Sequence, residues 1–430
     1  MKHTIITLLM LASLGTIHAE EWSLDSCITY AIEHNLTIKS QDIEQMGGEL
    51  SVTEAKDRFL PTLSAGANQS WDFGRGLTSE NTYANRNTSM FGWNANLSLP
   101  LFQGLSAVRQ LKYAHANLKM LSEQKEAAKD EVTLSVISYY LQALYNREML
   151  AVNEEQLRLS KVQLERQRIM LEAGKVPEVD VIQAEAQVAK DELSVVTAGN
   201  DYQLALIDLA KVLELDDVTG FDVKPLPDNA VSLLSADEVY NNALSFNHSI
   251  LAARQGIEVA DKAVTVAKSG YLPRLNFNAG LGSSYYTVSG MDGNSFGKQM
   301  RDNFSKSLGF SLSVPIFDAF STRNQIRQAK VRRLNAELNL AQQQSELHKT
   351  IRQAYYQAVG AEKKYHAGET AVNAAKAALD AMTEKYNYGK ANATEWEQTQ
   401  STYITTLAQQ VQAKYEMILR NRILLFYNKH

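Results

Sequence analysis

An internal duplication constrains the fold of this 430-residue chain more than any other feature of its sequence. The segment 97–102 (LSLPLF) returns as LSVPIF at 312–317, a shift of 215 positions, and the same shift joins Gly174 to Gly389. A repeat of this length exceeds the roughly twenty to fifty residues of a solenoid unit. The chain is therefore built from two similar structural halves with internal pseudo-symmetry.

Proline placement predicts where long helices lie. None of the seven prolines falls in 101–176, and none follows Pro315. Because proline breaks helix interiors, these gaps admit long helices, and their Ala, Leu, Glu, Gln, Lys and Arg content favours helix. We expect helices near 104–173 and 319–388, each ending at a glycine and followed at once by a second helix. The pattern predicts two long helical hairpins with sharp tips.

Heptad spacing within the predicted hairpins is typical of coiled coils. In the first long helix, leucines fall seven residues apart at Leu150, Leu157, Leu164 and Leu171. In the return helix, spacings of three and four alternate through Val181, Ala184, Val188, Asp191, Val195, Ala198, Tyr202 and Ala205. These positions are the expected contacts between the helices of a hairpin.

Four other segments alternate apolar and small polar residues with the period of two that marks β-strands. They cover about 62–73, 90–100, 274–286 and 306–315. Their length and alternation suit strands of a membrane barrel with apolar side chains toward lipid, although one face of a soluble sheet also alternates. The aromatic residues that we expect to face lipid are Trp71, Phe73, Phe91, Trp93, Phe277 and Phe310.

Strand number adds a constraint on assembly. Four strands are too few to close a barrel, yet a membrane tolerates no open sheet edge. If these strands cross a membrane, several chains must therefore pool them into one barrel. The segments 74–90 and 286–306, which join the strands of each pair, are polar and are expected to be exposed loops.

The first residues resemble a secretory signal, because Lys2 precedes an apolar run that ends at Ile17. We predict a signal peptide over 1–19, which places the exported chain outside the cytoplasm. The single cysteine, Cys27, excludes an intrachain disulfide. A lipid anchor on Cys27 is one interpretation of this residue, and a small buried side chain on the first helix is the other.

Several function classes find no support in the sequence. A formal net charge of −5 argues against a nucleic-acid partner. The histidines are scattered without ligand spacing, and no phosphate-binding loop or nucleophile elbow occurs. We therefore expect no enzyme activity, no catalytic residue, no cofactor and no metal site. By the repeat, the first structural half covers 20–232 and the second 233–430, joined by a turn-rich connector at 214–236.

The order of these features resembles the TolC-like outer-membrane efflux family over essentially the whole mature chain. That order is signal peptide, helix, Leu-Pro-x-Leu strand, Leu-Ser-x-Pro-[Leu/Ile]-Phe strand, long helix and glycine-tipped hairpin, with all but the signal repeated. The resemblance implies a mainly α fold with a membrane β portion. Each chain would supply two coiled-coil hairpins and four strands to a homotrimer whose shared twelve-stranded β-barrel continues into an α-helical barrel.

The resemblance also implies a location and a function. The protein would lie in the outer membrane of a Gram-negative bacterium, contact its lipid and extend into the periplasm. It would be the passive exit duct of a tripartite efflux or type I secretion system, with a periplasmic adaptor and an inner-membrane pump of RND, ABC or MFS type. Small-molecule or drug efflux is the favoured cargo, and polypeptide export is the alternative. A periplasmic coiled-coil adaptor or structural protein is the alternative from another class.

Site residues follow from matching the family pattern position by position. The resemblance implies that the periplasmic tips contact the adaptor at Gly174, Lys175, Val176, Gly389 and Lys390. It places the gate or constriction at Asp180, Glu395, Tyr386 and Gln398.

The tip also departs from the family pattern. Ala391 stands where an arginine is expected, with Lys390 as a candidate substitute, and Gln398 stands where a second carboxylate is expected. Carboxylates repeated by symmetry around a pore would attract cations. The alternative role of Asp180 and Glu395 is local, because an acid in the first turn of a helix interacts favourably with the helix dipole.

Overall fold

The computed structural model describes residues 20–77, 81–226 and 234–428. The predicted signal peptide, 1–19, lies outside the described residues, as does part of the predicted connector. The described chain is predominantly helical with few strands, which confirms the predicted fold class of helical hairpins combined with a four-stranded sheet.

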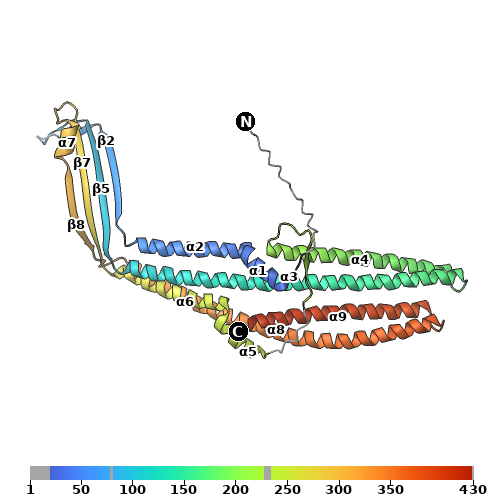
Figure 1. The fold of residues 1–430 in the computed structure, drawn as a ribbon. Coiled ribbons are helices and arrows are strands. Elements are labelled where there is room, and N and C mark those ends of the chain that lie inside the picture. The colour runs from blue at the N-terminus through green and yellow to red at the C-terminus, as the bar shows by residue number, and fades with distance from the viewer. Residues whose placement is uncertain (1–19, 78–80, 227–233, 429–430) are drawn as a thin grey trace, which may run out of the picture. The chain divides into compact units, whose positions relative to one another are not determined.

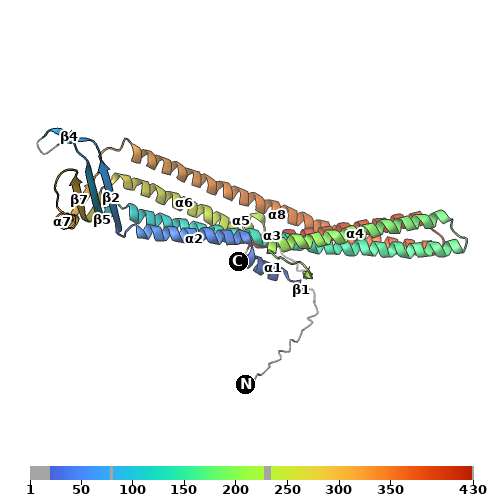
Figure 2. The ribbon, with the colours of Figure 1, turned by 90° about the horizontal axis from the view of Figure 1, so that it is seen from above.

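Two long helical hairpins account for most of the chain, and both views show each return helix running alongside its long helix (Figure 1, Figure 2). The first hairpin pairs α3 (Ser106–Glu172) with α4 (Glu178–Leu213), and the second pairs α8 (Ser321–Asn387) with α9 (Ala393–Tyr427). The long helices begin and end within a few residues of the ranges that the proline-free gaps predict.

The chain divides into two compact units, each with segments from both sequence repeats. Of the described residues, one unit contains those up to Gln41, those within 126–248 and those from Gln344 onward, and the other contains those within 42–125 and 249–343. The first holds the helical tips, and the second holds the four-stranded sheet. Helices α3 and α8 each contribute residues to both units. The duplication in sequence and the compact units are thus different divisions of the same chain.

Shorter elements connect the hairpins and the sheet. The helices are α1 (Leu24–His34), α2 (Leu36–Asp57), α5 (Ala236–Phe246), α6 (His248–Ala267) and the 3-10 helix η1 (Lys268–Tyr271). In addition, β1 (Glu20–Trp22) pairs in parallel with β6 (Phe221–Val223), which lies in the segment expected to be a turn-rich connector.

The four predicted strands form one antiparallel sheet of order β2-β5-β7-β8. Their bounds are β2 (Thr62–Asp72), β5 (Thr88–Gln103), β7 (Arg274–Val288) and β8 (Ser305–Ser313). The central β5–β7 pair joins one strand from each repeat. Register shifts between Pro100 and Phe102, where proline cannot donate to the ladder, so β5 continues past its proline by a bulge.

Strand register gives this sheet two faces of different chemistry. Directly opposite residues of an antiparallel pair share a face, and Trp93 lies opposite Ala67 while Phe277 lies opposite Phe310. The apolar face carries Leu63, Ala65, Trp71, Phe91, Trp93, Leu97, Phe277, Leu281, Leu308 and Phe310. The other face carries Ser64, Gly66, Asn68, Ser70, Asn94, Asn96, Asn278, Gly280, Ser307 and Gly309. Of the residues predicted to face lipid, only Phe73 lies outside the sheet, directly after β2.

Both segments expected to be loops contain secondary structure. The first forms a small hairpin of β3 (Arg75–Leu77) and β4 (Tyr83–Asn85), and the second contains α7 (Phe296–Asp302). Arg86 holds the hairpin in place, because its guanidinium donates to the Leu77 carbonyl at 2.8 Å and to the Tyr286 hydroxyl at 3.0 Å. A single arginine with two partners leaves no periodic pattern in the sequence, so sequence analysis could not predict this ordered hairpin.

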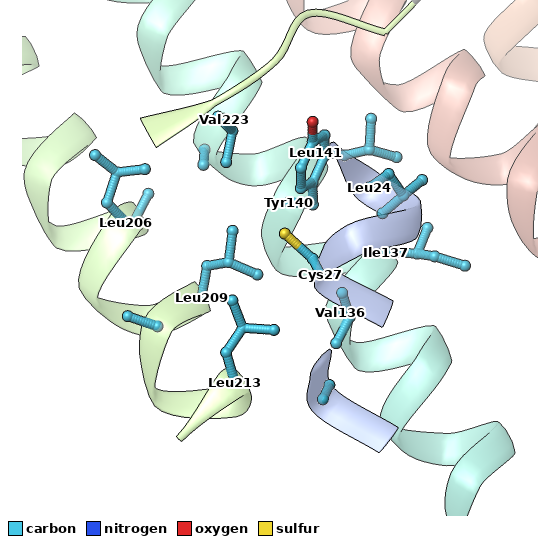
Figure 3. Close-up of a cluster of buried hydrophobic side chains, with 14 of the residues drawn as sticks. Leu24, Cys27, Val136, Ile137, Tyr140, Leu141, Leu206, Leu209, Leu213 and Val223 are labelled. Carbon is cyan, nitrogen blue, oxygen red and sulfur yellow. The ribbon is translucent and has the colours of Figure 1, made fainter. Parts of the chain in front are cut away.

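A hydrophobic core in the helical unit surrounds Cys27 (Figure 3). The cysteine is fully buried on α1, among side chains of α3 and α4 that include Leu141 and Leu209. Burial raises the pKa of its thiol to about 12, so the thiol stays uncharged at neutral pH. A lipid attached to this sulfur would have to leave the core. The structure therefore supports the interpretation of Cys27 as a small buried side chain.

Tyr140 connects this core to the two short parallel strands. Its side chain is fully buried, and its hydroxyl lies 2.7 Å from the Lys224 carbonyl and 3.0 Å from the Trp22 carbonyl. Tyr140→Phe should destabilise the helical unit by about 1–2 kcal/mol, since it removes a buried donor while keeping the ring. The measurement is thermal unfolding by circular dichroism in detergent. Tyr139→Phe, at an exposed neighbour, is the control, and equal midpoints for the two variants would contradict the assignment.

Candidate functional site

Both helical hairpins turn at a glycine with left-handed backbone, with φ +67° at Gly174 and φ +69° at Gly389. No described atom outside the turn lies within 4 Å of a Cβ built on either glycine, so positive φ, and not crowding, favours glycine there. Each turn has the two backbone bonds of a Schellman motif. These are Gly174 N to Leu171 O at 2.8 Å, Lys175 N to Met170 O at 2.9 Å, Gly389 N to Tyr386 O at 3.1 Å and Lys390 N to Lys385 O at 2.9 Å.

The residues predicted to contact an adaptor lie at these turns. The two glycines and the lysines that follow them, Lys175 and Lys390, are exposed, while Val176 is half-buried. Each tip therefore has an exposed glycine turn and one exposed lysine, both accessible to a partner.

Both acidic residues predicted for the gate lie in the first turn of a return helix, Asp180 in α4 and Glu395 in α9. Glu395 forms a capping box with Asn392. The Glu395 N–H donates to Asn392 Oδ1 at 2.8 Å, and the Asn392 N–H donates to Glu395 Oε2 at 3.1 Å. Within one chain, the local role of a first-turn acid is therefore present at Glu395, and Asp180 occupies the matching place in α4.

Tyr386, also predicted for the gate, is buried and bonded to the other hairpin. Only 6% of the residue is exposed. Its hydroxyl accepts hydrogen bonds from Nε2 of Gln163 at 2.8 Å and from Nε2 of Gln167 at 2.9 Å. Both glutamines belong to α3, so these bonds join the end of α8 to the first hairpin.

Arg166 binds the same tyrosine from α3. Its guanidinium carbon lies 4.3 Å from the Tyr386 ring centroid, its Nη2 donates to the Tyr386 carbonyl at 3.3 Å, and its Nη1 donates to Asn387 Oδ1. A guanidinium over an aromatic face is attracted by the ring quadrupole. Lys390, the substitute that the sequence suggests for the arginine missing at Ala391, is exposed and makes no ion pair among the described residues. The cation beside Tyr386 comes instead from the opposite hairpin.

Trp396 contacts Tyr386 from α9. The two rings stack with centroids 6.2 Å apart and an interplanar angle of 27°, and Trp396 Nε1 donates to Thr383 Oγ1 at 2.9 Å. Together with the buried Leu379, these two aromatic residues form an apolar cluster near the second tip. Tyr386 thus has apolar contacts within its own hairpin and polar contacts to the other one.

Polar side chains occupy the most buried positions in the distal part of α3. Ser160, Gln163 and Gln167 are 5%, 5% and 1% exposed, whereas Leu164 of the predicted leucine stripe is only half-buried. The predicted stripe is therefore wrong as the centre of the contact in this region. A heptad search based on apolar residues misses it, because the heptad positions that face the partner helices carry hydroxyl and amide groups.

Asp191 extends this polar contact into the first hairpin. It is buried in α4 and accepts hydrogen bonds from Gln187 at 2.9 Å, from Gln156 at 3.2 Å and from the Ser160 hydroxyl. Gln156 in turn lies 3.5 Å from Gln400 of α9. Because a buried carboxylate is costly without partners, these bonds fix how α3 meets α4 and α9.

Gln398, also predicted for the gate, is exposed, and the carboxyl of the adjacent Glu397 interacts with Asp180. Partial burial and, second, the negative charge of Asp180 raise the pKa of the Glu397 carboxyl above its usual value. Asp180 lies in the first turn of α4 and Glu397 lies near the start of α9, so their repulsion acts between the two hairpins.

Two further features, a metal site and a membrane-spanning helix, concern the described part of the chain. No group of three or more His, Cys, Asp and Glu side chains in it could hold a metal ion. None of its helices is long and apolar enough to cross a membrane. What the tips do present is a set of aromatic, amide and carboxylate contacts between two hairpins.

Comparison with known proteins identifies the family to which this architecture belongs. The model of the outer membrane efflux protein family matches residues 27–214 and 239–425, which is most of the chain and covers both repeats. The chain therefore belongs to the outer membrane efflux protein family, whose members form channels. It is an outer-membrane exit duct for efflux or type I secretion, and it extends into the periplasm.

Individual relatives agree with this assignment. The chain is 24% identical over 419 residues to the outer membrane efflux protein BepC of Brucella suis, covering 96% of this chain and 87% of BepC. It is 22% identical to the alkaline protease secretion protein AprF of Pseudomonas aeruginosa, covering 92% of this chain and 82% of AprF. A crystal structure of CusC shares the fold, with a TM-score of 0.80 at 14% identity over 94% of this chain and 91% of that chain.

Removal of the Tyr386 hydroxyl tests the contact between the hairpins. Tyr386→Phe leaves the Gln163 and Gln167 amides without their buried acceptor, which costs about 1–3 kcal/mol. We expect a higher mean conductance in planar-bilayer recordings, because the packed tip loses stability relative to an opened one. Tyr388→Phe, at a tyrosine that is 78% exposed, is the matched control. Equal conductance of Tyr386→Phe, Tyr388→Phe and the unmodified protein would rule out this role.

The Glu397 carboxyl predicts how the tip responds to pH. A raised pKa in the packed tip means that packing favours the protonated carboxyl, so this stabilisation is present at low pH and lost as pH rises through the raised pKa. Glu397→Gln should therefore lower conductance relative to the unmodified protein near pH 7, and the difference should vanish near about pH 4. A difference that stays constant across this range would contradict the raised pKa of the Glu397 carboxyl.

Proposed function

We propose that this chain is the outer-membrane duct of a tripartite system that exports small molecules, and that it works as a homotrimer. The observation that carries the proposal is the four-stranded sheet, with open edges at β2 and β8 and two faces of opposite polarity. A sheet within a membrane must satisfy every backbone group internally. Three copies joined edge to edge would supply twelve strands and leave no open edge.

The two faces decide how the strands are oriented in the proposed barrel. The face with Trp71, Trp93 and Phe310 turns toward lipid, and the face with serine, asparagine and glycine lines the pore. In a single chain the lipid face is largely uncovered at β2 and β8, where Trp71 is 62% and Phe310 is 71% exposed. Exposed aromatic side chains of this kind are favourable in contact with the hydrocarbon of a bilayer.

The proposed gate is the contact around Tyr386 at the periplasmic tips. Separation of the hairpins there breaks bonds to three residues of α3 and widens the tip. Asp180 and Glu395 lie in the first turns of the return helices and Gln398 lies one turn further along α9, so trimer symmetry would repeat each of them around the pore. A ring of carboxylates of this kind attracts cations and repels anions.

The partners in this proposal follow from the exposed turns. Proteins of this family work with an inner-membrane pump and a periplasmic adaptor. The adaptor would contact Gly174, Lys175, Val176, Gly389 and Lys390, and the pump would be of RND, ABC or MFS type. Two similar tips on each chain would give the trimer six related docking places.

Cargo is the second part of the proposal. BepC is named as an efflux protein, which supports small-molecule export, whereas AprF is named for secretion of alkaline protease and supports polypeptide export as the second candidate. A periplasmic coiled-coil adaptor would account for the hairpins. It leaves the two-faced sheet with open edges unexplained.

Fractionation tests assembly and location together. The protein should remain in the outer-membrane fraction until detergent is added and should then have the mass of three chains by light scattering corrected for bound detergent. Leu308→Glu places a charge on the proposed lipid face and should reduce membrane insertion. Ser307→Glu places the charge on the pore face and should not reduce it. A protein released without detergent, or a monomer in mild detergent, contradicts the duct as proposed.

Deletion of the gene separates the two cargoes. For small-molecule export we expect increased susceptibility to toxic compounds with an unchanged profile of secreted proteins. Loss of one or more secreted proteins with unchanged susceptibility would favour polypeptide export instead. Complementation with the unmodified gene is the control for both measurements.

A further inference from the structure

Strand β7 is longer than the neighbour that covers one of its edges. On one side it pairs with β5 up to Val288, but on the other side β8 pairs only with Arg274–Gly282. The backbone of 283–288 would therefore present a free strand edge beyond the first residue of β8. Free edges are templates for pairing with another chain.

Helix α7 and its C-cap residue Asn303 lie at this edge and bind three of its backbone groups with side-chain amides. The Gln299 amide binds both backbone groups of Tyr286, since the Tyr286 N–H donates to Gln299 Oε1 at 3.0 Å and Gln299 Nε2 donates to the Tyr286 carbonyl at 3.0 Å. Asn303 Nδ2 donates to the Ser284 carbonyl at 2.7 Å. The two side chains thus make three of the bonds that a further strand would make. Both views show α7 beside the end of β7 (Figure 1, Figure 2).

Aromatic contacts hold α7 against the sheet. Phe296 lies 5.0 Å from Tyr285 and 5.8 Å from Phe91 between ring centroids, and Phe304 lies 6.3 Å from Trp93. The Ser283 hydroxyl adds a bond of 2.7 Å to the carbonyl of Met300. The cap is therefore packed as well as hydrogen-bonded, and it covers part of the apolar face.

The blocked edge of β7 limits which strand of this chain a second copy can pair with. Strand direction alternates through β2-β5-β7-β8, so β8 of one copy and β2 of the next run antiparallel when the copies meet. A slip of one residue in the register between the two strands would move every side chain of the joining strand from its proper face of the sheet to the opposite face. A free edge on β7 would offer a competing template directly beside the correct one.

We propose that α7 is a strand stop that confines pairing between copies to β8, over Ser305–Ser313, and thereby sets the register of the seam between them. This inference rests on the proposed trimeric barrel. The occupant of the β8 edge is β2 of a second copy of this chain. Gln299 and Asn303 are the residues that exclude any strand from 283–288.

Disulfide trapping measures the register between β8 of one copy and β2 of the next. In a Cys27→Ala background, Ser307→Cys in β8 is combined in turn with one cysteine in β2, at position 64, 66, 68 or 70. All five positions lie on the polar face. Within one chain the two strands are three strand spacings apart, about 14 Å, so a disulfide can form only between copies. We expect one β2 position to give most of the cross-linked product.

Loss of the cap should spread the register. In the double variant Gln299→Leu, Asn303→Leu, the ratio of the main cross-link to the next should fall about fivefold or more, since bonds that exclude the wrong register are lost. Lys298→Leu, at an exposed position of the same helix, is the matched control and should keep the original ratio. If the double variant forms a trimer with an unchanged ratio of cross-links, the strand stop is contradicted and the proposed function is not. If the unmodified chain forms no trimer, the proposed function is contradicted as well.

Amide hydrogen exchange tests the cap without any substitution. In the detergent-solubilised trimer, the Tyr286 N–H should exchange slowly because Gln299 accepts its hydrogen bond. Exchange of that amide as fast as the exposed glycine turn at Gly290 would overturn the inference, even if the double variant fails to fold.

Discussion

Unmade backbone hydrogen bonds along β2 and β8 govern the rest of this structure. A sheet of four strands has two edges, and in a membrane neither water nor lipid headgroups satisfy them within the hydrocarbon region. The duplication brings β5 and β7 together and removes two potential edges inside one chain. Only the outer pair is left for another copy. The proposed strand stop answers the same constraint, because a seven-residue helix is packed against the part of β7 that β8 leaves uncovered.

The two ends of the helical unit are held together by different physics. Near Tyr140 and Cys27, fully buried apolar side chains from α1, α3 and α4 pack into one core. Near the tips, the buried positions of α3 carry serine and glutamine, whose bonds reach α4 and α8. Directional polar contacts specify one alignment of the hairpins, and water can replace them when the hairpins part. Position along the helix thus separates an apolar core from a polar contact, which is where the proposed gate would open.

Sequence reasoning identified the elements with long periodic patterns. The helices follow from the gaps between prolines, and the strands follow from alternation that the register at Trp93 and Phe277 confirms. Contacts between distant residues were beyond its reach, since nothing local marks Arg166 as the cation for a tyrosine 220 positions away. Helix α7 is too short for periodicity to detect. At the second tip, the interaction of Glu397 with Asp180 joins residues of two different hairpins, and no local pattern marks it.

The polar seam along α3 has a thermodynamic consequence that an apolar seam would lack. Exposure of apolar surface carries a large positive heat-capacity change, whereas exposure of polar surface carries a smaller one of opposite sign. Parting the hairpins at Ser160, Gln163 and Gln167 exposes amide and hydroxyl groups together with the half-buried aliphatic carbons beside them, so the two contributions largely cancel. The balance between the packed and parted tips should then vary almost linearly with temperature. The enthalpy and entropy of parting the tips would then stay nearly constant over the temperatures at which a bacterium grows.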